Sequence, residues 1–174
     1  GYGSALLESC IDDARRQGKS GVCMLGAEKQ KAWLSDQNFA RRFGFETVDA
    51  TPDSYELLAL SLDGTKPRFA SSVTQRIDDK GLVVYYDMQC PFIPARVAVL
   101  QKYCAEQGIP ARFVEVDSLA AAKSLPCVFN NWAVFYGGVF QTVNQLDPTA
   151  LERILKRKKS AGSSACRIRN GLIE

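Results

Sequence analysis

The chain has 174 residues, of which 46% are hydrophobic and 24% charged, as in an ordinary globular protein that buries a core in one domain or two small ones. It contains no histidine, which excludes Ser-His and Cys-His catalysis and histidine metal sites. The net charge of +3 is modest and does not by itself predict a nucleic-acid or membrane partner.

The sequence of residues 1–62 predicts a helix, a strand, a short helix and two further strands. Apolar residues at helical spacing predict the first helix over Ser4–Gln17, and the continuous apolar run "GVCML" predicts a buried strand. "SDQNFARRFGF" is typical of a short helix capped by Ser35 or Asp36. "FETVD" and "YELLALSL" predict two strands joined across the turn "ATPDS". The irregular segment 63–80 predicts a linker.

Residues 81–158 predict a second unit with its own strand order. "GLVVYYD" predicts a strand, and Phe92–Gln107 a helix long enough to make the next strand, "ARFVEVD", parallel to the first. "LAAAK" predicts a short helix, and "PCVFN" and "AVFYG" predict two paired strands. The final helix, "DPTALERILKR", has Asp147 as its cap and Pro148 at its first position.

Residues 159–174 predict a basic tail, which we expect to be flexible. Residues 156–174 carry six basic side chains against one acid, a net charge of +5, whereas the rest of the chain carries −2. A short basic run at a terminus is more often solvated than bound to nucleic acid or a membrane, so we assign it no such partner.

The six cysteines do not predict a disulfide framework, because three of them lie within apolar stretches where a reduced thiol packs like a small hydrophobic residue. No signal peptide and no membrane-spanning run is evident, which makes the cytoplasm the expected location. Cys90 and Cys127, with no histidine in the chain and no cluster of carboxylates, predict no metal site.

The first residues, "GYGSALLESC", combine a Gly-x-Gly pair with the start of a helix. Unpaired backbone N–H groups at a helix N-terminus bind phosphate, and glycines allow close approach, so Gly1, Tyr2, Gly3 and Ser4 are candidate cofactor-binding residues. Taken alone, the pair is more often the pattern of a mobile terminus.

The order of elements after this loop resembles the second half of the GNAT superfamily of N-acetyltransferases. In that family a Gln/Arg-x-x-Gly-x-Gly/Ala loop binds the pyrophosphate of acetyl-CoA, and a helix ending in Gly-Phe packs beside the thioester. By this resemblance Gly1 and Gly3 occupy the last two places of the loop, and Gly44 and Phe45 form the Gly-Phe ending. The resemblance implies acetyl-CoA as cofactor and acetyl transfer to an amine.

The resemblance leaves the general acid unassigned. The family commonly has a tyrosine four residues before the Gly of Gly-Phe, and Ala40 stands there, with Phe39 beside it. Tyr55 or Tyr2 could substitute, whereas Phe39 and Phe43 are expected in the core. The early strands of the family are absent from this chain, so we expect it to bind acetyl-CoA poorly and to be inactive alone.

The second unit resembles the thioredoxin fold, with "DMQCPFIPARV" in place of the redox loop. A helix N-terminus stabilises a thiolate, which makes Cys90 a candidate reactive thiol, although Ile93 replaces the usual second cysteine. The resemblance implies a cis Pro126 and places Cys127 near Cys90, so a Cys90–Cys127 disulfide is a hypothesis. The alternative is that Cys127 packs into the sheet and Cys90 has no partner.

The two resemblances combine in the YoaP-like acetyltransferases, bacterial GNAT proteins with such a C-terminal domain, over residues 1–158. We therefore expect a mixed α/β (α+β) protein with a partial GNAT fold and a thioredoxin-like domain. The expected function is acetyl-CoA-dependent N-acetylation of a small-molecule or peptide amine. The alternative is a thiol-dependent redox or binding module that uses Cys90.

Overall fold

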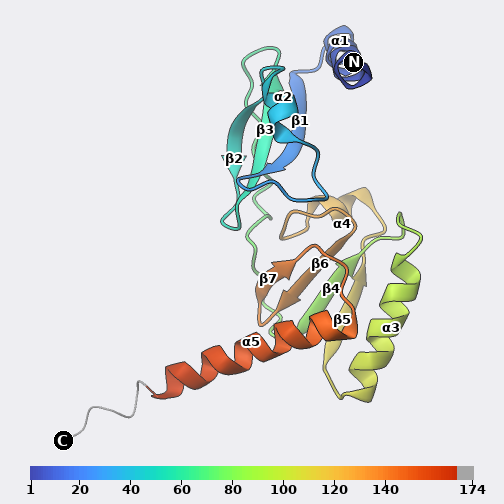
Figure 1. The fold of residues 1–174 in the computed structure, drawn as a ribbon, viewed down its shortest axis with the longest axis vertical. Coiled ribbons are helices and arrows are strands. Elements are labelled where there is room, and N and C mark those ends of the chain that lie inside the picture. The colour runs from blue at the N-terminus through green and yellow to red at the C-terminus, as the bar shows by residue number, and fades with distance from the viewer. Residues whose placement is uncertain (168–174) are drawn as a thin grey trace, which may run out of the picture. The chain divides into compact units, whose positions relative to one another are not determined.

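The computed structural model describes residues 1–167 and divides into two compact units, Gly1–Ser71 and a second that begins at Ser72 (Figure 1). The division falls inside segment 63–80, where the sequence predicts a linker. Each unit has one β-sheet with helices, so the chain is a mixed α/β protein. Over residues 1–167, none of the helices has the length and hydropathy needed to cross a membrane.

The first unit is a three-stranded sheet with two helices on one face. Its elements are α1 (Tyr2–Arg16), β1 (Gly21–Ala27), α2 (Gln37–Arg41), β2 (Glu46–Ala50) and β3 (Tyr55–Ser61). The strand order is β1-β3-β2, and both pairs are antiparallel, so the last strand lies between the first two. Its small core consists of Ile11, Ala40, Phe45 and Leu58.

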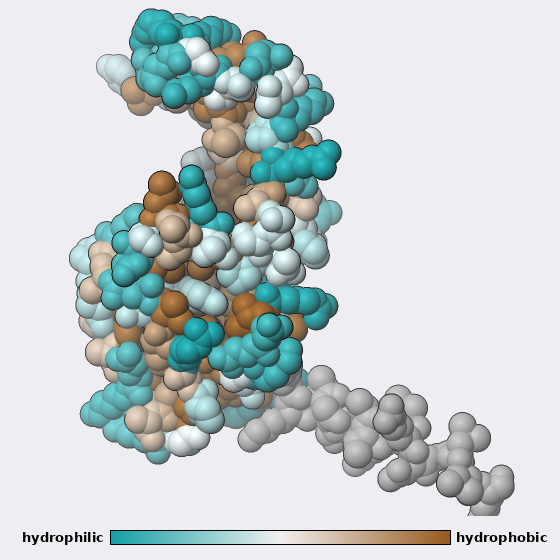
Figure 2. Space-filling view, turned by 180° about the vertical axis from the view of Figure 1, so that it is seen from behind, coloured by the Kyte–Doolittle hydropathy of each residue, from teal (hydrophilic) through white to brown (hydrophobic). Residues whose placement is uncertain are grey.

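Helix α1 begins two residues earlier than the sequence predicts. The N–H of Ala5 donates to the carbonyl of Gly1 over 3.2 Å, so Tyr2, Gly3 and Ser4 already form the first helical turn. The outer surface of α1 is largely hydrophilic (the teal region at the top of Figure 2). This surface agrees with an amphipathic helix that packs through one apolar face.

Helix α2 is short because both of its ends are specified by local chemistry. Of the two predicted caps, Asp36 is the one used: its carboxylate accepts a hydrogen bond from the N–H of Asn38 at 2.9 Å. Gly44 follows with a φ of +84°, a conformation that favours glycine and turns the chain toward β2.

The second unit is a four-stranded sheet in the order β5-β4-β6-β7. As the sequence predicts, β4 and β5 are parallel, and the other two pairs are antiparallel. The carboxylate of Asp147 accepts from the N–H of Ala150 at 2.7 Å, which confirms the predicted cap of the last helix. The elements are β4 (Leu82–Tyr86), α3 (Ile93–Glu106), β5 (Ala111–Glu115), α4 (Leu119–Lys123), β6 (Trp132–Tyr136), β7 (Val139–Thr142) and α5 (Pro148–Arg167).

Both faces of this second sheet are covered. One face packs against α3 and α5 through a core that includes Leu82, Ile93, Trp132 and Leu151. The opposite face buries Val83, Cys127, Ala133 and Phe135. The alternation of side chains along β4 and β6 supplies both cores from the same two strands.

Two predictions for the second unit are wrong. "PCVFN" is not a strand; the hairpin is formed by β6 and β7 around Gly137 and Gly138, whose φ angles of 62° and 80° suit a tight hairpin turn. No cis peptide bond occurs within residues 1–167, so Pro126 is trans. Helix α5 extends to Arg167, and the rest of the expected basic tail, residues 168–174, lies outside the described residues, so the flexible tail stays a prediction.

Candidate functional site

The first turn of α1 presents free backbone donors. Because the N–H of Ala5 is the first to bond within the helix, the N–H groups of Tyr2, Gly3 and Ser4 have no acceptor inside it. No acidic side chain lies in this turn, and Tyr2 is 93% exposed. The turn therefore offers a positive helix end that an anion can reach.

The two glycines leave space around this turn. A side chain at Gly1 would meet no atom within 4 Å, and one at Gly3 would make an ordinary contact, 3.7 Å from the ring of Phe39. Packing among the described residues therefore does not require glycine at either position. Because the Phe39 ring lies within 3.7 Å of where a Cβ of residue 3 would be, the start of α1 is beside α2.

The candidate proton donors are not brought together. Ala40 is 1% exposed and belongs to the core, so α2 supplies no acid at the place that the resemblance implies. Tyr55 is buried at the start of β3, with its ring centre 4.7 Å from the ammonium of Lys31 and 5.9 Å from the ring centre of Trp33. Tyr2 lies instead in the first turn of α1. The aromatic contacts of Tyr55 join residues far apart in sequence, so no local pattern could have indicated them.

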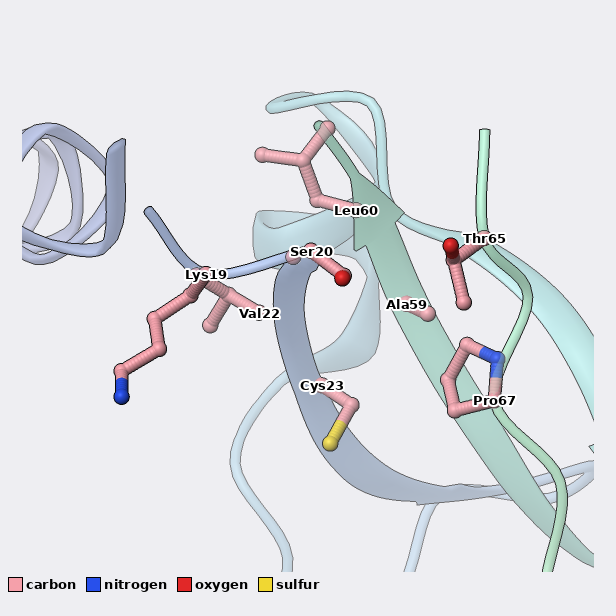
Figure 3. Close-up of a pocket in the computed structure, with 9 residues that line it drawn as sticks. Lys19, Ser20, Val22, Cys23, Ala59, Leu60, Thr65 and Pro67 are labelled. Atoms are coloured by element: carbon pink, nitrogen blue, oxygen red, sulfur yellow. The ribbon is translucent and has the colours of Figure 1, made fainter. Parts of the chain in front are cut away.

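A cavity of about 300 Å³ lies at the start of β1 (Figure 3). β1 and β3 form one side of it, and the segment with Thr65 and Pro67 forms another. Its wall is mainly apolar, from Val22, Ala59, Leu60 and Pro67, with polar atoms from Ser20, Cys23 and Thr65. The sequence analysis did not indicate this cavity, because segment 63–71 has no regular pattern and its position over the sheet depends on a tertiary contact, from the N–H of Phe69 to Asp49 at 2.9 Å.

In the second unit, Cys90 lies just before α3. Its carbonyl accepts from the N–H of Ile93 at 3.1 Å, and its half-buried thiol packs against the core beneath α3. The side-chain amide of Gln145 donates toward the Cys90 sulfur over 3.8 Å. Gln145 comes from the loop after β7, far away in sequence, so the pairing could not be predicted from the sequence.

Cys90 and Cys127 are not joined by a disulfide. Cys90 packs with the core under α3 and α5, whereas Cys127 belongs to the core on the opposite face of the same sheet. The sheet separates the two thiols, which corrects the disulfide hypothesis. The alternative for Cys127, packing into the sheet, describes what is observed.

The clearest electrostatic network of the second unit joins α3 to α5. The hydroxyl of Tyr103 donates to one oxygen of Glu152 at 2.7 Å, and the ammonium of Lys156 donates to the other at 2.8 Å. The hydrogen bond from Lys156, and then that from Tyr103, lowers the pKa of the Glu152 carboxyl. The same bond to Glu152, together with burial, raises the pKa of Tyr103. Neither Tyr103 nor Glu152 is a candidate for catalysis. Their hydrogen bond joins α3 to α5.

Comparison with known proteins links the chain to acetyltransferases. The family described as "YoaP-like" matches residues 110–153. A curated protein of Bacillus subtilis (strain 168), "Uncharacterized N-acetyltransferase YoaP", is 29% identical over 158 residues, which cover 89% of this chain and 63% of that protein. No solved structure matches. The chain thus spans less than two thirds of the length of this relative, and the two matches support an acetyltransferase-related family for it.

Proposed function

We propose that the intact protein is an acetyl-CoA-dependent N-acetyltransferase of the GNAT type that transfers acetyl directly to a small-molecule or peptide amine. The observation that carries this proposal is the first turn of α1, which lies beside the start of α2. The N–H groups of Tyr2, Gly3 and Ser4 have no acceptor within the helix, and the turn carries no acidic side chain. The similarity to a protein named as an N-acetyltransferase supports the same class.

In this function the residues Gly1 to Ser4 hold the pyrophosphate. The N–H groups of Tyr2, Gly3 and Ser4 donate to phosphate oxygens, and the helix dipole adds a favourable charge. Bound acetyl-CoA supplies the activated acetyl group. The contribution of the protein is to orient both reactants and to stabilise charge through fixed backbone donors. Since the side chain of Ala40 has no ionisable group, Tyr2, whose side chain is exposed in the first turn of α1, is the candidate proton donor of this proposal.

The second unit is a thioredoxin-like accessory domain in this proposal. Support comes from its element order and from the parallel pairing of β4 with β5 on either side of α3. Cys90, placed before α3 with the amide of Gln145 beside its sulfur, is its candidate reactive atom. The trans Pro126 departs from what the resemblance implies.

The test is acetyl-CoA binding to the full-length protein, measured by calorimetry, with Tyr2→Glu and its matched control Tyr2→Gln. A carboxylate in the first turn repels pyrophosphate, so Tyr2→Glu should weaken binding at least about tenfold, a change of about 1.4 kcal/mol. The same charge favours the helix by about 0.3–1 kcal/mol, so thermal stability should stay equal or rise. Tyr2→Gln should change neither quantity appreciably.

Failure of the full-length protein to bind acetyl-CoA would overturn the proposal. Equal affinity of Tyr2→Glu and Tyr2→Gln would remove the assigned phosphate site while leaving the enzyme class open to another site. Weaker acetyl-CoA binding together with unchanged or higher thermal stability cannot come from general damage to the fold. This pair of variants therefore tests the phosphate site and not the stability of the protein.

A thiol-dependent module is the second candidate, favoured by the contact between Cys90 and Gln145. Alkylation of Cys90 at pH 6, followed by mass spectrometry, distinguishes it. A module of this kind requires Cys90 to react faster than a free thiol, and a rate no higher than that of a free thiol would contradict it.

A further inference from the structure

The cavity at the start of β1 lies on the face of the first sheet that is opposite to α1 and α2. Val22 and Leu60 pack against the core beneath these two helices. Because side chains alternate along a strand, those of Cys23 and Ala59 point to the other face. Figure 3 shows Cys23 and Ala59 on the same side of the strands as Pro67. The cavity therefore has one wall of sheet and one wall formed by the segment after β3.

The wall of this cavity suits a short apolar chain. The side chains of Ala59 and Pro67 carry no polar atom, and the small size of Ala59 leaves space above the sheet. A volume of about 300 Å³ is at the lower end of the range for small-molecule sites. The cavity therefore fits a chain of a few carbon atoms and not a large cofactor.

Asp63 places a negative charge at one end of the cavity. Its carboxylate accepts a hydrogen bond from the N–H of Thr65 at 2.8 Å. This bond, and then the hydroxyls of Ser20 and Thr65, lower the pKa of the Asp63 carboxyl, so it is ionised at neutral pH. Ser20 belongs to one wall of the cavity and Thr65 to the other, so the carboxylate joins the two walls at their polar end.

The charge of Asp63 has no counterion within the structure described. Among the described side chains, no ammonium or guanidinium forms an ion pair with this carboxylate. Lys19 also lines the cavity, but its side chain extends away from Thr65 and Pro67 (Figure 3). An apolar wall with an unpaired carboxylate at one end is complementary to a cation that carries an apolar chain.

We propose that this cavity binds a small organic amine, with its ammonium at Asp63 and its apolar chain against Ala59 and Pro67. A carboxylate has acceptor positions beyond those that Thr65 and Ser20 use, and an ammonium has three donors to fill them. The inference goes beyond the proposed function and does not depend on acetyl transfer.

This amine site is separate from the phosphate-binding turn. That turn begins α1, whereas Lys19 follows the end of the same helix. The 15 residues of α1 span about 22 Å along the helix axis, so the two sites lie at opposite ends of it. The two sites can therefore be tested independently.

Cys23 supplies the readout, because its exposed thiol lies in the wall of the cavity. The full-length protein is treated with iodoacetamide, with and without hexylammonium, and mass spectrometry follows the modification of each cysteine. A bound chain covers the thiol, so hexylammonium at saturation should slow the modification of Cys23 at least about fivefold. Cys10 is the internal control: it is exposed on α1 and does not line the cavity, so its rate should not change.

Two further probes separate the charge from the chain. Hexanol has the same chain without the charge, and hexanoate has the opposite charge. Half-maximal protection of Cys23 should need about two- to fivefold more hexanol than hexylammonium, the size expected of an ion pair exposed to solvent. Hexanoate should protect Cys23 less than hexanol does, because Asp63 repels it.

Asp63→Asn removes the charge and keeps an acceptor for the N–H of Thr65. In this variant hexylammonium and hexanol should protect Cys23 equally. Asp117→Asn is the matched control: it removes the same charge from an exposed position of the second unit that does not line the cavity. It should keep the preference for hexylammonium.

Three outcomes would overturn the proposal. The first is no protection of Cys23 by saturating hexylammonium, and the second is equal protection by hexylammonium and hexanol in the unchanged protein. The third is a native full-length protein in which Cys10 reacts and Cys23 does not, because the cavity would then be covered. Acetyl-CoA binding is measured separately, so none of these outcomes bears on the proposed function.

Discussion

The two units differ in how completely their sheets are covered. In the second unit, β4 and β6 contribute side chains to cores on both faces, and its fully buried residues include Trp132, Phe135 and Leu151. In the described first unit, Leu58 is the one large side chain that is fully buried. Strand β1 pairs on one side with β3 and has no partner strand on its other side among the described residues. The described second unit thus buries both faces of its sheet, whereas the described first unit buries fewer large side chains.

The difference indicates where binding is expected. An open strand edge and an exposed helix start are costly features for a domain, because unpaired backbone groups invite association. The free donors of α1 and the hydrogen bonds between the Gln37 side chain and Ala27 both occur in the unit with the smaller core.

Trp132→Ala should have the largest effect on stability. The side chain is fully buried, and its removal leaves a cavity, so we expect a loss of about 3–5 kcal/mol in the free energy of unfolding. Trp132→Phe is the control: it keeps a ring and removes an indole N–H that has no hydrogen-bond partner within the described part of the chain. Denaturant unfolding followed by circular dichroism measures both. Equal losses for the two variants would show that the cavity is not the cause.

A smaller effect is expected from the network of Tyr103, Glu152 and Lys156. Because the folded state lowers the pKa of Glu152, its contribution is present at neutral pH and is lost as the pH falls below about 4. Because the folded state raises the pKa of Tyr103, the contribution of its hydroxyl is lost as the pH rises above about 10.

The unfolding temperature, measured across this pH range, reports both losses of stability. Glu152→Gln should reduce the fall of the unfolding temperature at acid pH, and Tyr103→Phe should reduce its fall at alkaline pH. If the unfolding temperature of Glu152→Gln falls as steeply at acid pH as that of the unchanged protein, other carboxyl groups cause the loss of stability.

Leu6→Ser should have the smallest effect and would sharpen the comparison of the two units. Leu6 lies on α1 but is 72% exposed, so it contributes little to the core of the first unit. We expect a change within about 0.5 kcal/mol in the free energy of unfolding. A loss above about 1 kcal/mol would mean that α1 is covered in solution by a surface that the described structure does not include.

Local patterns predicted most of the elements. Helical spacing indicated α1 and α3, the crossover length indicated the parallel pairing of β4 and β5, and Asp147 indicated the start of α5. The strand assigned to "PCVFN" was wrong because a short apolar run can be buried without joining a sheet. The partner of β6 follows Gly137 and Gly138, and a Gly-Gly pair between two apolar runs is itself typical of a hairpin turn.

The candidate site was less predictable than the fold. The start of α1 was predicted to within two residues, because a helix end is a local feature. The bonds of Gln37 with Ala27 and of Gln145 with Cys90 are tertiary and left no pattern in the sequence. The position of Cys127 behind the sheet could not be derived either, since it depends on how "PCVFN" crosses that face.

The side chain of Gln37, which bonds with Ala27, lies close to Gly26, and this contact has a consequence for the divergence of related sequences. A side chain at position 26 and an amide at position 37 exclude each other sterically, so neither position can change freely while the other is kept. Relatives that carry alanine or a larger residue at the first position should have replaced the glutamine at the second. The two positions should therefore vary together, even where the rest of β1 and α2 changes.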